Sequence, residues 1–171
     1  MRPGISKTLL KKAVSFENKY FKDYGLNGGL RHLFSTISRC KIVVVPPDEF
    51  QREGVAGRYK DTEILLSSRL VGEELDQVLL HEMIHYYEVT ASDPQNGTRY
   101  LIEYLSFYLR DKLAAQLPIK EIIEYEMYSM VPAHTYFLIL MSIDLDLKLN
   151  LQPGTIFNYG RAKAWKRFCG V

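Results

Sequence analysis

The chain has 171 residues, with 22 Lys and Arg against 20 Asp and Glu and a formal net charge of +2. This length suits one domain with a sizeable core, and so small a charge does not by itself indicate nucleic-acid binding. The longest apolar run, residues 136–141, is too short to span a bilayer, and the start lacks the apolar stretch of a secretory signal. Cys40 and Cys169 lie far apart in the sequence, which favours reduced thiols over a disulfide framework. We therefore expect a single domain over residues 1–171, in the cytoplasm and without membrane association.

The first part of the chain is expected to form helices followed by a small sheet. Apolar residues at helical spacing predict a helix over residues 9–24 and, after a Gly/Asn break, a short helix over residues 30–37. A β-branched run at residues 41–45, stopped by two prolines, predicts a strand. Residues 63–67 form a second apolar run that predicts another short strand, and the Gly-containing segment 57–61 before it predicts a turn.

Acidic residues at positions 73–76 indicate the first turn of a longer helix, where the helix dipole favours negative charge. Apolar residues then recur three and four positions apart, as expected for a helix packed against a core. They are Leu75, Val78, Leu79, Met83 and Tyr86 or Tyr87.

The second half is expected to be mostly helical. A polar, Pro- and Gly-containing segment at residues 91–97 predicts a loop, and Thr98 is a suitable N-cap for a helix that ends near Gln116. Residues 134–149 are ambiguous, since their Asp–Leu alternation favours a strand and their length favours a helix. Further helices are predicted over residues 120–130 and 160–168. The fold class is therefore α+β, with a small sheet ahead of a mostly helical half.

The segment His81-Glu82-Met83-Ile84-His85 is the strongest functional signal in the chain. On a helix, residues i and i+4 lie on one face, so the two imidazoles can converge on one metal ion. Glu82 lies one residue further along and is placed to reach a water on that metal, as a general base does in zinc-dependent hydrolysis. The alternative is an amphipathic helix that carries a His pair and a solvated Glu on its surface.

A catalytic zinc usually has three protein ligands and a water, so a third residue is needed. Glu103 is the first choice, because it follows on the next predicted helix among apolar residues, where a buried carboxylate needs a cation. A surface ion pair with a neighbouring Arg is its alternative role. Asp93 in the loop, Glu88 on the same helix and the distant His134 are the other candidates.

A zinc site of this kind also needs a donor for the oxyanion of the transition state. His134 is one candidate for this donor. Tyrosines are the others, and they include Tyr100, Tyr104 and Tyr128.

The stretch Leu79-Leu80-His81-Glu82-Met83-Ile84-His85-Tyr86-Tyr87 resembles the zinc helix of SprT-like metallopeptidases. The resemblance extends upstream over about the first half of the chain. It includes Phe16 to Phe21, Ala56-Gly57-Arg58, Ile64 to Ser67 and Glu73-Glu74-Leu75. The resemblance implies a zincin-like metallopeptidase fold, a Zn²⁺ cofactor, His81 and His85 as ligands and Glu82 as the catalytic base.

The second half departs from the SprT-like pattern. That family supplies a third His followed by Gly after the loop, whereas this chain has Gln95-Asn96-Gly97-Thr98 there. Glu103 instead resembles the glutamate ligand of gluzincins, including the ImmA/IrrE-like group. The resemblance thus implies a metal set of His81, His85 and Glu103.

These observations lead to one main hypothesis and two alternatives. The main hypothesis is a zinc metallopeptidase that hydrolyses peptide bonds in protein or peptide substrates. The first alternative is a non-catalytic module that uses the same fold to bind or regulate a partner, although a pure binder does not need Glu82. The second is nucleic-acid binding by basic residues near the C-terminus, with Trp165 stacking on a base. Those basic residues are Arg161, Lys163, Lys166 and Arg167.

Overall fold

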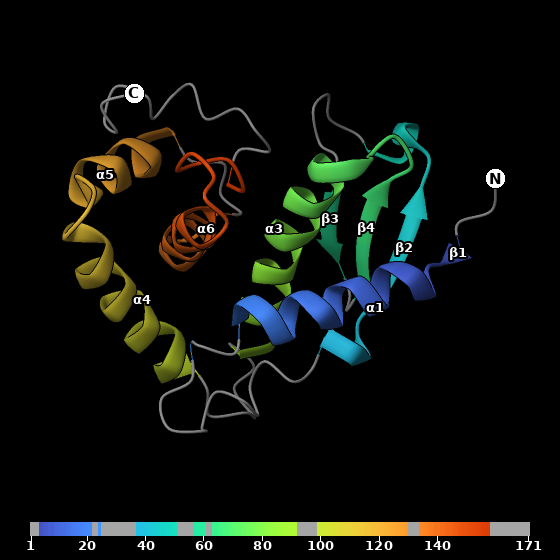
Figure 1. The fold of residues 1–171 in the computed structure, drawn as a ribbon, viewed down its shortest axis with the longest axis horizontal. Coiled ribbons are helices and arrows are strands. Elements are labelled where there is room, and N and C mark those ends of the chain that lie inside the picture. The colour runs from blue at the N-terminus through green and yellow to red at the C-terminus, as the bar shows by residue number, and fades with distance from the viewer. Residues whose placement is uncertain are drawn as a thin grey trace. The chain divides into compact units, whose positions relative to one another are not determined.

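A computed structural model of the chain describes residues 4–21, 24, 37–50, 57–60, 63–91, 99–129 and 134–157. The chain divides into two compact units, Met1–Val89 and Thr90–Val171. The first contains the sheet and the helix with the His81–His85 motif, and the second is helical (Figure 1). The predicted α+β class is therefore confirmed.

The first unit is built on a mixed sheet with the strand order β1-β2-β4-β3. Its strands are β1 (Gly4–Ile5), β2 (Lys41–Val45), β3 (Gly57–Lys60) and β4 (Glu63–Ser67). The central pair, β2 and β4, is parallel, whereas β1 and β3 are antiparallel to their neighbours. Ile42, Ile64 and Leu66 on the central strands are fully buried, so one face of the sheet lies in the core.

Two long helices accompany this sheet. α1 (Lys7–Phe16) is capped by the Ser6 side chain and continues into the π-helix η1 (Glu17–Phe21). α3 (Gly72–Ala91) carries the motif and begins with Glu73 and Glu74 in its first turn, as predicted. An ion pair between Lys12 and Asp76 joins the two helices. Two short 3-10 turns, η3 (Ile37–Arg39) and η4 (Pro47–Glu49), flank β2.

α3 packs against the strand β3 at the edge of this sheet. Gly57 lies directly against the side chains of Val78 and Glu82, and the ring of Tyr59 meets that of Tyr86 edge-on at 5.7 Å between centroids. Val78, Glu82 and Tyr86 are four residues apart, so they form one ridge of α3 along the strand. The predicted apolar stripe is buried at Val78, Leu79 and Met83.

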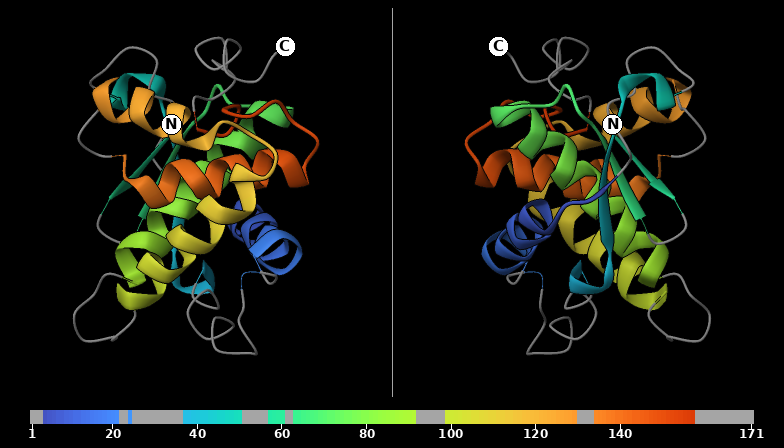
Figure 2. Two further views of the ribbon diagram at one scale, coloured as in Figure 1. Left: turned by 90° about the vertical axis from the view of Figure 1, so that its left-hand side faces the viewer. Right: turned by 90° about the vertical axis from the view of Figure 1, so that its right-hand side faces the viewer.

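The second unit contains three helices, α4 (Arg99–Ala114), α5 (Ile119–Ser129) and α6 (Tyr136–Lys148). Figure 2 shows α4 running beside α6, and the two helices are in contact. Leu105, Leu109 and Leu113 form the buried side of α4. α6 is buried at every residue from 137 to 146 and starts at the N-cap Thr135, whose hydroxyl accepts a hydrogen bond from Leu138 N.

Several sequence predictions have clear outcomes. The strands predicted at 41–45 and 63–67 are confirmed as β2 and β4. The helix predicted from residue 73 is confirmed as α3, and those predicted from Thr98 to Gln116 and over 120–130 are confirmed as α4 and α5, with ends that differ by one or two residues. The ambiguous segment 134–149 is a helix, α6, because its two Asp side chains are satisfied inside the protein and do not alternate into solvent. The predicted turn at residues 57–61 is wrong, since 57–60 form strand β3.

Other predictions concern parts of the chain outside the described residues. These are the Gly/Asn break, most of the helix 30–37, the loop after Ala91, the N-cap Thr98 and the C-terminal helix 160–168. None of the described helices is both long enough and apolar enough to cross a membrane. The expectation of a single domain over 1–171 stays a prediction.

Candidate metal centre

His81 and His85 lie side by side on α3. Their ring centroids are 4.9 Å apart and the ring planes meet at 70°. His81 is 1% exposed, and His85 is half-buried. The predicted pairing of the two rings on one helix face is therefore confirmed, and the alternative of a His pair on the surface is wrong for His81.

Glu82 belongs to the neighbouring ridge of α3, which faces β3. Its side chain is only 2% exposed and lies against the backbone of Gly57. A carboxylate held this far from solvent is costly to bury as an anion, and such groups concentrate at functional sites. The alternative of a solvated Glu82 is therefore wrong, and its role as general base stays a prediction.

His134 lies immediately before the N-cap of α6, in the second unit. Its ring packs against that of Phe157 at 4.9 Å between centroids and an interplanar angle of 61°. Burial lowers the pKa of His134 below its usual value. The neutral imidazole, which is the form that binds metals, is therefore favoured at neutral pH.

Among the residues that the structure describes, His81, His85 and His134 form a cluster that could hold a metal ion. Each offers one ring nitrogen, and these nitrogens lie within 4.8 Å of one another. Three imidazoles suit zinc, copper, nickel, cobalt or iron and do not suit magnesium or calcium, which prefer oxygen ligands. The cluster is thus a candidate site for a transition metal or zinc.

Glu103, predicted as the third ligand, is not part of this cluster. It lies on α4 as expected, but its side chain is exposed, so the expectation that Glu103 is buried is wrong. Its role as a metal ligand stays a prediction without that support. Glu88 is half-buried on α3, and Asp93 lies outside the described residues.

The candidate oxyanion donors differ in exposure and in their place in the fold. Tyr100 and Tyr104 are 79% and 46% exposed on α4, and the side chain of Tyr128 is not described. His134 lies with the two motif histidines in the metal cluster. Its predicted role as a donor is untested, and its position suits a ligand.

Gly57 is the residue near the motif whose role sequence reasoning missed. The sequence predicts a turn at Gly57, but this residue lies in the extended strand β3, and its φ is not positive. In the sequence, Gly57 precedes a predicted strand that leads into the motif. A glycine at such a position can serve either in a turn or in a close packing contact, so the sequence does not distinguish the two roles.

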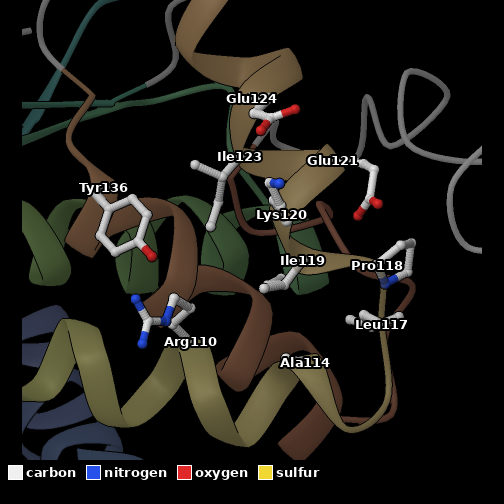
Figure 3. Close-up of a pocket in the computed structure, with 10 residues that line it drawn as sticks. All are labelled: Arg110, Ala114, Leu117, Pro118, Ile119, Lys120, Glu121, Ile123, Glu124 and Tyr136. Atoms are coloured by element: carbon white, nitrogen blue, oxygen red, sulfur yellow. The ribbon is translucent and has the colours of Figure 1, made fainter.

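A separate hollow of about 600 Å³ lies in the second unit (Figure 3). It is lined by the end of α4, the start of α5 and Tyr136, whose hydroxyl points toward Arg110. Its lining contains no His or Cys, and the charges of Arg110 and Lys120 are balanced by those of Glu121 and Glu124. This hollow therefore lacks the imidazole and thiolate ligands that zinc sites most often use.

Other candidate residues have simple outcomes. Cys40 is a buried thiol, and burial raises its pKa to about 12. Such a thiol is a poor nucleophile at neutral pH. Cys169, Trp165 and the basic residues predicted to bind nucleic acid lie outside the described residues.

Comparisons with protein-family models, curated proteins and solved structures give no match to this chain.

Proposed function

We propose that this protein is a zinc-dependent peptidase in which His81, His85 and His134 hold the metal and Glu82 is the general base. The observation that carries the proposal is the pair of adjacent rings on α3 with the buried Glu82 between them in sequence. The small sheet packed on this helix also supports the resemblance to SprT-like metallopeptidases and other zincins.

Zinc is the proposed metal because the ligands are neutral nitrogens and one position stays open for water in a three-histidine set. Zinc held in this way lowers the pKa of its water and polarises a carbonyl. His81 and His134 are suited to hold it because both rings are at least partly buried, and burial lowers the pKa of His134, which favours its neutral form.

Glu82 is proposed to accept a proton from the attacking water and to pass it to the leaving amine. Glu82 is 2% exposed, so its carboxylate is shielded from bulk water, as a positioned general base requires.

A peptide is the proposed substrate class because β3 lies at the edge of the described sheet and beside the motif helix. An extended peptide can pair with an edge strand through main-chain hydrogen bonds. β4 lies inside the sheet between β2 and β3, so β3 (Gly57–Lys60) is the strand proposed to pair with the peptide.

The metal content of the purified protein tests the ligand set. We expect about one zinc per chain in the wild type and near-complete loss in His81→Ala and His85→Ala. His134→Ala should weaken zinc affinity by at least about 10- to 100-fold. That is the usual loss when a residue that only hydrogen-bonds to a metal ligand is removed, and loss of a ligand itself should cost no less. Glu103→Ala is the matched control and should bind zinc as the wild type does. Loss of zinc in Glu103→Ala, with retention in His134→Ala, would instead establish the gluzincin-type ligand set.

Hydrolysis of fluorescently labelled casein tests the reaction. Glu82→Gln should keep its zinc and lose about 100- to 10,000-fold of kcat/KM, the usual contribution of a general base. A zinc-loaded wild type that binds casein without cleaving it would favour the non-catalytic binding module.

A further inference from the structure

Gly57 occupies the point of closest approach between β3 and α3. In the antiparallel pair β3–β4, Gly57 lies opposite Leu66 and Tyr59 opposite Ile64. Side chains alternate along a strand, so positions 57 and 59 share the face toward α3. Arg58 and Lys60 are exposed on the other side.

A side chain at position 57 would collide with the catalytic ridge of α3. A Cβ atom there would lie 2.7 Å from Oε1 and 2.9 Å from Cγ of Glu82, and 2.6 Å from Cγ1 of Val78. Non-bonded carbon atoms are most stable at about 3.5–4.0 Å, so all three contacts are too short. The space that a Cβ would fill is therefore taken by the Glu82 side chain.

We propose that Gly57 is a positioning residue that sets the location of the Glu82 carboxylate. The inference rests on the proposed function, in which Glu82 is the general base. Glu82 can rotate away from an added methyl group, because its carboxylate is the end of a flexible side chain. A substitution at position 57 would thus move the base, whereas His81 and His85 lie on a different ridge of α3.

The test is Gly57→Ala, measured for zinc content and for kinetics with labelled casein. We expect full zinc content, KM within about threefold of the wild type and kcat lower by about 10- to 100-fold, since a displacement near 1 Å can cost 100-fold. Arg69→Ala, at an exposed position after β4 and away from the motif, is the matched control and should keep the wild-type kcat.

Two double variants separate positioning from packing. Gly57→Ala with Val78→Ala removes the contact with Val78, so it should fold well and still have the low kcat. Gly57→Ala in the Glu82→Gln background should cause no further loss of kcat, because Gly57 acts through Glu82.

The outcomes distinguish this inference from the proposed function. Full activity of Glu82→Gln would overturn the proposed function and this inference with it. An inactive Glu82→Gln together with wild-type kcat in Gly57→Ala/Val78→Ala would overturn the inference alone. Failure of both Gly57 variants to fold, or loss of their zinc, would assign Gly57 to packing and also overturn it.

Discussion

Asp146 illustrates how one residue organises the second unit around His134. Its carboxylate is fully buried and accepts hydrogen bonds from Gly154 N at 2.7 Å and Ile156 N at 3.0 Å. Burial raises the pKa of Asp146 to about 7, although these backbone bonds lower it. The bonds fix the segment after α6 that ends in Phe157, whose ring contacts His134.

The raised pKa of Asp146 predicts a pH-dependent stability. The folded state keeps a proton up to about pH 7, whereas the unfolded chain releases it near 3.8. The free energy of unfolding should therefore fall as pH rises from about 4 to 7 and then level off, by at most about 4 kcal/mol at 1.36 kcal/mol per pKa unit. Asp146→Asn should remove this fall in urea unfolding with a chelator present. An unchanged slope in the variant would contradict the prediction.

At the scale of the element, α3 uses its sides for different purposes. The ridge Val78–Glu82–Tyr86 faces β3, and the neighbouring ridge presents His81 and His85. A further side carries Tyr87, whose hydroxyl donates a hydrogen bond to Glu17 Oε1 at 2.9 Å and whose ring lies 4.9 Å from that of Phe21. The helix is thus tied to both the sheet and η1, which holds the motif histidines in place.

Tyr87→Phe tests the tie between α3 and η1. The variant keeps the ring packing on Phe21 but removes the donor to Glu17, whose pKa is raised by burial. We expect a loss of about 1–2 kcal/mol in the free energy of unfolding, since a half-buried carboxylate loses a hydrogen bond. Tyr100→Phe, at a highly exposed position, is the control and should change nothing. Equal stability of Tyr87→Phe and wild type in urea would exclude a stabilising role for this bond.

At the scale of the whole molecule, the chain consists of two compact units, Met1–Val89 and Thr90–Val171, and the motif histidines belong to the first. A metal that binds only the folded protein raises its stability by mass action. The metal is therefore expected to affect the thermal stability of the chain as well as its chemistry.

Thermal unfolding with and without Zn²⁺ measures this linkage. At a zinc concentration about 1,000 times the dissociation constant, the gain is about 4 kcal/mol. For a chain of this size that corresponds to a rise in Tm on the order of 10 °C. The rise should disappear in His81→Ala and shrink in His134→Ala. A His134→Ala protein that gains as much as the wild type would remove His134 from the ligand set.

The sequence by itself determined the elements whose signals are local. Acidic residues followed by a periodic apolar stripe predicted α3, and the i, i+4 spacing predicted that His81 and His85 share a face. β-branched and apolar runs likewise predicted β2 and β4. These patterns depend only on helix and strand periodicity, which neighbouring residues encode.

Only the tertiary structure decided the features that depend on contacts between distant segments. Asp144 and Asp146 alternate with leucines as in a strand, yet Lys112 and the backbone after α6 satisfy both carboxylates inside the protein. Gly57 reads as a turn residue until Glu82 is seen to fill the space beside it. Glu103 was expected to be buried and is exposed, because the orientation of α4 is set by its leucine face against α6. In each case, the deciding atoms belong to residues far away in the sequence, where periodicity carries no information.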